Sequence, residues 1–203
     1  MLNKFDKWRL FLSSYLPLYI LIIIQNYSFF SSMLKNILIK LNGISGTIKE
    51  EPPYKWIFFG VIIFLNLISF CTIHRFVISK SNRKFNITGK YEKTGDSIIS
   101  YIFTYLVPLL SMDINNGNSI IVNLLLFIFI GVLYVAQDLI YLNPILALLG
   151  FSFYINDEKI IITKFSLEKL KEFEENGYKV KGNRLGSYIY VFREVISKED
   201  SHM

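Results

Sequence analysis

The sequence is poor in the residues that build metal and redox sites. Cys71 is its single cysteine, which excludes an internal disulfide and any multi-cysteine metal site. The two histidines, His74 and His202, do not stand at a zinc-type spacing, and there is no Walker loop, dinucleotide-binding glycine pattern or serine-hydrolase elbow. No nucleophile can be paired with a base. We therefore expect a protein that is not an enzyme and that holds no metal or cofactor.

Charge is missing from long stretches of the chain. The uncharged runs are 10–34, 56–74, 97–112 and 114–137, in a sequence that is 52% hydrophobic. Surface positions of a soluble protein interrupt an apolar pattern every turn or two, so runs of this length are typical of membrane helices. The sequence therefore predicts an integral membrane protein.

We expect four spans within a transmembrane domain covering residues 1–150, which together form a four-transmembrane-helix bundle. The spans are predicted at about 10–29, 56–73, 97–112 and 120–142. The third is short: fifteen residues rise about 22 Å, against a hydrocarbon layer of roughly 30 Å. Residues 139–142 are expected to form the last turn of the fourth helix. Asn143-Pro144 stops that helix, and a short helix at 144–149 is expected to lie at the membrane interface.

The distribution of lysine and arginine predicts the orientation, because cytoplasmic loops collect basic residues. The N-terminal stub holds three, the loop after the second span six, and the tail nine. Cytoplasmic N and C termini thus place 18 of the 22 basic residues inside. The expected location is the inner membrane of a bacterium, crossed several times.

The tail, residues 151–203, is predicted to be a small cytoplasmic α+β domain. Strands are expected at 151–155 and 159–163, a helix capped by Ser166 at 167–175, and further strands at 178–180 and 187–192. About 50 residues are marginal for independent stability, so the domain should lean on the membrane part or on another chain.

Four polar residues stand out in or beside the predicted spans. They are Asn66, Asn123, Gln137 and Asp138. A carboxylate near hydrocarbon is costly, so Asp138 either lies in a polar or paired environment or faces water at the headgroup boundary. The two asparagines could form hydrogen bonds between helices, with a packing role favoured for both.

The cytoplasmic face is the predicted binding surface for a partner. Its candidate residues are Arg75, Arg83, Lys84, Phe85, Lys90, Tyr91 and Tyr190. The basic loop should also contact anionic membrane lipid. No nucleic-acid-binding fold is recognisable, so direct contact with nucleic acid is not expected.

Two stretches resemble a known family. One is 98–111, with Thr104-Tyr105 and Pro108, and the other leads from Ile130 to Asn-Pro-Ile-Leu-Ala-Leu-Leu-Gly-Phe at 143–151. Both are similar to the KwaA family, the membrane component of the Kiwa anti-phage defence system. The resemblance implies a homo-oligomeric sensor of phage attack, a tetramer by analogy, that works with the soluble DNA-binding effector KwaB.

The leading hypothesis is therefore a non-enzymatic inner-membrane sensor and scaffold that recruits a cytoplasmic DNA-binding effector. The alternative is an oligomeric pore or transporter, with Gln137 and Asp138 lining a path. A membrane-embedded enzyme ranks last, because no catalytic pair can be named.

Overall fold

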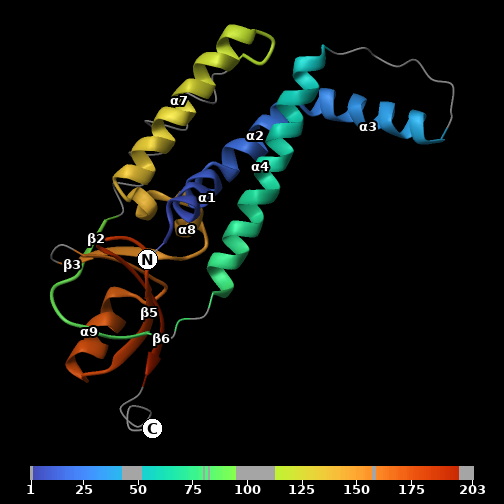
Figure 1. Cartoon of the computed structure of the whole chain (residues 1–203). Coiled ribbons are helices and arrows are strands. Elements are labelled where there is room, and N and C mark those ends of the chain that lie inside the picture. The colour runs from blue at the N-terminus through green and yellow to red at the C-terminus, as the bar shows by residue number, and fades with distance from the viewer. Residues whose placement is uncertain are drawn as a thin grey trace.

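The computed structural model describes residues 2–42, 52–79, 81, 83–94, 113–156 and 159–196. Apolar helices lie at one end and a β-sheet lies at the other (Figure 1). The chain starts close to the sheet, where the backbone N–H of Leu2 donates to the carbonyl of Leu185 at 2.8 Å. The first helix then leads away from the sheet.

The first apolar run is broken rather than straight. Helix α1 spans Lys4–Ser14 and helix α2 spans Leu16–Gln25, with a bend of 41° between them. Pro17 lies in the first turn of α2, has no N–H to donate to the preceding turn, and disfavours a helical residue before it. A third helix, α3 (Tyr27–Asn42), leaves at a wide angle (Figure 1). The run expected as one span at 10–29 is therefore divided among α1, α2 and the start of α3, and the bent pair α1–α2 together is still apolar enough to cross a membrane.

Two long apolar helices follow. Helix α4 spans Pro53–Ile78 and helix α7 spans Gly117–Ala136. In the described part of the chain, these two are each long and apolar enough to cross a membrane, and the bent pair α1–α2 would add a third if it acts as one span. The expected span 97–112 lies outside the described residues.

The predicted four-transmembrane-helix bundle is thus wrong. Within the described residues there are two candidate spans, or three with the bent pair, and a six-stranded sheet accompanies them. Residues 139–142 do not continue α7: Asp138 has a φ of 53°, in the left-handed region, and a separate 3₁₀-helix spans Leu139–Leu142. A left-handed residue ends an α-helix, which is why the fourth predicted span stops at Ala136. Helix α8 (Pro144–Leu148) matches the short helix expected after Asn143.

Helix α1 packs against both long helices. The ring of Phe11 lies 5.3 Å from that of Tyr134 and 5.1 Å from that of Phe127, both on α7. On the other side, the hydroxyl of Ser69 on α4 donates to the carbonyl of Leu12 at 3.1 Å. Phe11 is fully buried, so α1 forms the centre of the helical layer.

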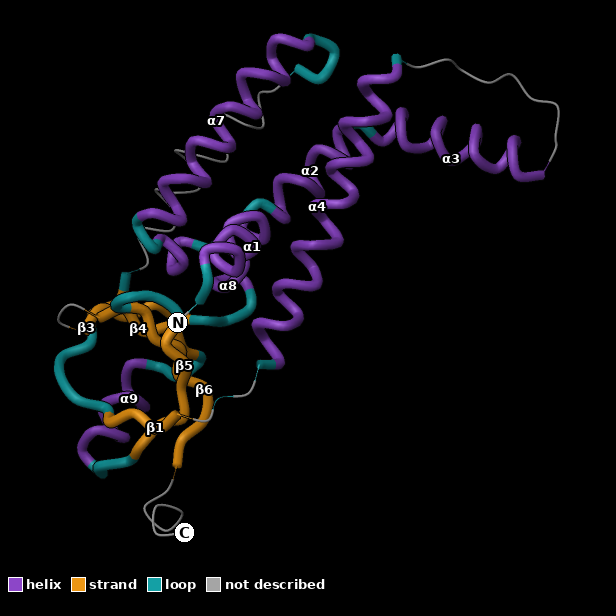
Figure 2. Tube along the Cα trace, viewed as in Figure 1, coloured by secondary structure: helices purple, strands orange, loops and turns teal. Residues whose placement is uncertain are grey.

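The sheet combines the tail with the loop that follows α4 (Figure 2). Its strand order is β1-β5-β6-β4-β3-β2, with β4 and β6 parallel and the other pairs antiparallel. The strands are β1 Arg83–Asn86, β2 Glu92–Lys93, β3 Ser152–Asn156, β4 Lys159–Thr163, β5 Lys179–Arg184 and β6 Ile189–Ile196. The strands and the helix expected in the tail are confirmed, including the Ser166 cap of helix α9 (Leu167–Glu175).

Both faces of the sheet are covered. Side chains alternate along a strand, so Ile160 and Ile162 of β4 join the core shared with the helices while Ile161 faces the other way. There it meets Leu170 of α9 in a second, smaller core. Burial on both faces explains why β4 reads as an uninterrupted Ile-Ile-Ile run.

Candidate functional site

Polar side chains that are buried form hydrogen bonds and an ion pair where the helices meet the sheet. We call this region the junction: the start of α1, the C-terminal ends of α4 and α7, Asn143, and residues 185–193. At its centre, the carboxylate of Asp138 forms an ion pair with the ammonium of Lys7 on α1. The second carboxylate oxygen accepts the backbone N–H of Ser187 at 3.2 Å. Asp138 is 6% exposed.

Two local features make this pair possible. Aspartate adopts the left-handed conformation more readily than most residues, so Asp138 can end α7 and turn its side chain towards the sheet. Gly186 lets the turn after β5 approach, because a Cβ there would lie 2.9 Å from the Asp138 Oδ2. The contact therefore depends on an aspartate at position 138 and on a glycine at position 186.

A second contact joins the end of α7 to the sheet. The hydroxyl of Tyr188 donates to the backbone carbonyl of Gln137 at 2.8 Å. Burial, followed by the nearby Tyr141 and Asp138, raises the pKa of Tyr188 above its ordinary value. The side chain of Gln137 is exposed. Gln137 thus contributes through its backbone.

Asn143 connects α8 to α1. Its side-chain oxygen accepts the N–H of Ile145 at 3.0 Å, which caps α8, and its amide donates to the Leu10 carbonyl and the Ser13 hydroxyl, each at 3.2 Å. Asn143 is fully buried, and these bonds satisfy both ends of its amide. In the sequence, Asn-Pro indicates a helix stop. That it also forms a cap is consistent with the preference of asparagine for the N-cap and of proline for the first helical position.

Arg193 of β6 connects the sheet to α4. Its guanidinium donates to the carbonyls of Phe76 and Val77, the latter at 3.0 Å, and lies 5.1 Å from the Phe76 ring centroid. A cation at the C-terminus of a helix satisfies free carbonyls and opposes the negative end of the helix dipole. Burial lowers the pKa of Arg193. Sequence reasoning missed Arg193 and Lys7, because neither lies in a motif.

The predicted partner-binding residues divide between the two edges of the sheet. Arg83 and Lys84 are exposed on the edge strand β1, and Phe85 beside them packs its ring 5.5 Å from that of Tyr190. Tyr91 lies near the opposite edge and is buried, which raises the pKa of its hydroxyl. Two further candidates are exposed. They are Arg75, near the end of α4, and Lys90, beside Tyr91.

The two asparagines of the long helices donate to their own helix. The amide of Asn66 donates to the Ile62 carbonyl at 3.0 Å, and that of Asn123 to the Ser119 carbonyl at 2.9 Å. Their expected role between helices stays a prediction. In the described ranges, no group of three or more His, Cys, Asp or Glu side chains could hold a metal ion.

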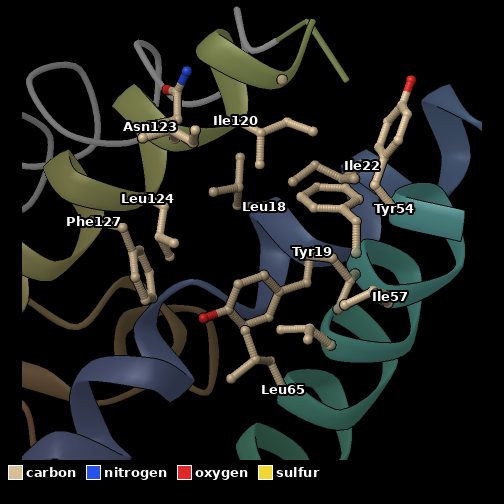
Figure 3. A pocket seen from close by; sticks show the side chains of 15 residues that line it. Leu18, Tyr19, Ile22, Tyr54, Ile57, Leu65, Ile120, Asn123, Leu124 and Phe127 are labelled. Atoms are coloured by element: carbon tan, nitrogen blue, oxygen red, sulfur yellow. The ribbon is translucent and has the colours of Figure 1, made fainter. Parts of the chain in front are cut away.

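An apolar groove of about 450 Å³ opens between α2, α4 and α7. Figure 3 shows side chains from all three helices converging on it, among them Ile22, Ile57 and Phe127, with Tyr54 and Asn123 at its margin. A lining of this kind suits hydrocarbon and offers no hydrated path for ions.

Comparisons with known proteins show which family the chain belongs to. The family model described as anti-phage protein KwaA matches residues 6–191, most of its length. The Kiwa protein KwaA of Escherichia coli O55:H7 (strain RM12579 / EPEC) is 36% identical over 56 residues, 28% of this chain and 29% of that protein. The aligned part thus spans less than a third of that relative. No solved structure matches the chain. Because the family match runs through both the helices and the sheet, the chain belongs to the KwaA family of anti-phage proteins.

Proposed function

We propose that this anti-phage protein is an inner-membrane sensor and scaffold whose sheet recruits a soluble effector in the cytoplasm. One observation carries the proposal: the loop after α4 and the tail form one sheet, and polar contacts, buried at Asp138 and partly exposed at Arg193, fasten that sheet to the helices. A scaffold that reports on the membrane needs such a connection, because a disturbance of the helices must reach the binding surface.

The helices are suited to a bilayer. At 1.5 Å per residue, α7 is about 30 Å long and α4 about 39 Å, enough for the hydrocarbon layer. Large apolar side chains are exposed along both, such as Phe64 and Phe70 on α4 and Phe129 on α7. Water would make these surfaces prone to aggregation, whereas lipid covers them without cost.

The sheet end is the proposed cytoplasmic end. Both α4 and α7 point their C-termini towards the sheet, and the N-terminal stub starts beside it (Figure 1). The described basic residues of the stub, the loop and the tail therefore belong to one end of the molecule. The positive-inside rule then assigns that end to the cytoplasm.

The junction is the proposed route from the helices to the sheet. Lys7 connects α1 to Asp138 at the end of α7, Asn143 connects α8 to α1, and Arg193 connects β6 to α4. A tilt of α4 would strain the contacts of Arg193, and a tilt of α7 would strain the buried pair of Lys7 and Asp138. Since a lost buried polar contact costs free energy, the sheet should move with the helices.

The β1 edge is the proposed docking surface. As an edge strand, β1 offers backbone groups to a partner, and Arg83 and Lys84 add positive charge. The expected partner is the DNA-binding effector KwaB that the family resemblance implies. The homo-oligomer expected from the same resemblance stays a prediction.

Reversing the charge at the β1 edge should weaken this docking. The double variant Arg83→Glu, Lys84→Glu is expected to lower affinity for the effector about tenfold at low salt and only slightly at high salt, because exposed charges mainly speed encounter and are screened. Affinity is measured by pull-down with the detergent-solubilised full chain at both salt concentrations.

Lys169→Glu with Lys171→Glu is the matched control. It makes the same change of charge on exposed positions of α9, which is not part of the edge strand, and should leave binding unchanged. Equal weakening by both pairs of substitutions would show that total charge matters rather than this edge, and full binding by the β1 variant would refute the docking surface.

A further inference from the structure

We infer that a phospholipid of net negative charge binds between α1 and α4, with its phosphate at Arg9 and Arg75 and an acyl chain in the apolar trough beside them. The inference rests on the membrane placement proposed above. It goes further by naming a ligand, a binding site and the residues that select it.

The trough is a cavity of about 370 Å³ between the two helices. Phe5, Trp8 and Leu12 line it from α1, and Leu67 and Ile68 line it from α4. Arg9 and Arg75 also line it. An apolar trough with two cations suits a molecule that has a hydrocarbon chain and an anionic head.

A second cavity of about 270 Å³ adjoins the trough and has a different character. Arg9 and Arg75 line this one too, together with polar residues such as Thr72, Ser79 and Asn183. The two arginines therefore stand at the boundary between an apolar and a polar space. A phospholipid has the same boundary at its phosphate.

The charge of the polar cavity is net positive. Asp6 is its one acidic lining residue, and its carboxylate lies 4.0 Å from the guanidinium of Arg9, at the outer limit of an ion pair. Arg193 also lines the cavity, but two of its N–H groups already donate to the carbonyls at the end of α4. Arg9 and Arg75 are thus the pair available for a phosphate, which guanidinium groups bind through parallel hydrogen bonds.

The height of the site along the helices agrees with this assignment. Arg9 lies in α1 close to the start of the chain, and Arg75 lies three residues before the end of α4, both near the sheet. With the sheet in the cytoplasm, this level is the headgroup layer of the inner leaflet. Trp8, beside Arg9, is a residue type that prefers the same layer.

Trp8 also provides the test, because Trp8 and Trp56 are the two tryptophans of the chain. The full chain carrying Trp56→Phe is reconstituted in phosphatidylcholine vesicles with increasing fractions of brominated phosphatidylglycerol or brominated phosphatidylcholine. Bromine quenches an indole that it contacts. Half-maximal quenching of Trp8 is expected at about a thirtyfold lower mole fraction of the anionic lipid, because two arginines near an anionic headgroup together contribute about 2 kcal/mol, at about 1.4 kcal/mol per factor of ten.

Replacing the two arginines distinguishes binding at this site from a general attraction between a basic protein and an anionic membrane. Arg9→Gln with Arg75→Gln should abolish the preference for the anionic lipid, whereas Lys35→Gln with Lys40→Gln, the same loss of charge on exposed positions of α3, should keep it. Three results would overturn the inference: equal quenching by both lipids, quenching by neither because protein fills the trough, or a preference that survives in the arginine variant. The effector is absent throughout, so these outcomes are independent of its recruitment.

Discussion

Asp138→Ala is expected to destabilise the protein by about 3–5 kcal/mol and to abolish protection against phage. The substitution leaves the ammonium of Lys7 buried without its counter-ion, and breaking one side of a buried ion pair costs that much. It also removes the acceptor of the Ser187 N–H and places alanine in a left-handed conformation that aspartate tolerates better. Thermal unfolding in detergent and plaque counts on cells that also express the effector measure the two effects.

Glu194→Ala is the control for this prediction. Glu194 pairs with Lys181 at 3.5 Å, but both side chains are largely exposed, so the change should stay within about 1 kcal/mol. Asp138→Asn should fall between the two, because asparagine keeps the left-handed conformation and an oxygen for Ser187. Its defect should shrink when Lys7→Met is added. If Asp138→Ala behaves like Glu194→Ala, the junction does not hold the helices and the sheet together.

Gly131→Leu is expected to separate α7 from α1. A Cβ at Gly131 would lie 2.7 Å from Cε1 of Phe11 and from Cη2 of Trp8, so the helices can touch here only because this residue has no side chain. Overpacking typically costs about 1–3 kcal/mol, and the larger leucine should reach at least the upper end of that range. We expect a lower unfolding temperature and, since the end of α7 carries Asp138, a loss of phage protection.

Gly60→Leu makes the same substitution in the other long helix. A Cβ at Gly60 would have no heavy atom of another segment within 4 Å, and the position is exposed, so leucine should be tolerated there. Equal stability of the two leucine variants would contradict the close packing of α1 on α7.

The sequence predicts the parts of the fold that depend on local patterns. The uncharged runs predict α4 and α7, and the strands and helix of the tail follow from alternation, turns and the Ser166 cap. The bend before α2 is a different case. Pro17 is visible in the sequence, but neighbouring helices in a membrane can accommodate proline, so its presence does not distinguish a kink from a break.

The contacts between distant segments could not be predicted. Strands β1 and β2 are short, exposed and highly charged, and only pairing with β5 and β3 makes them strands. Asp138 stands out in the sequence because a carboxylate near hydrocarbon is unfavourable. Its partner Lys7 lies 131 positions away and looks like part of a basic stub, so the pair could not be predicted. Asn143 marks a helix stop, while its bonds to α1 depend on how α8 packs.

Reporter fusions give the most direct test of the claim that the sheet lies in the cytoplasm with the helices in the membrane. Alkaline phosphatase is active only outside the cytoplasm, and green fluorescent protein exported in unfolded form fluoresces only inside it. Phosphatase fused after Asn116, at the end of α7 away from the sheet, should be active, while fusions after Phe85 and at the C-terminus should be fluorescent and inactive as phosphatase. An active phosphatase at the C-terminus would place the sheet outside the cytoplasm and contradict recruitment of a soluble effector there.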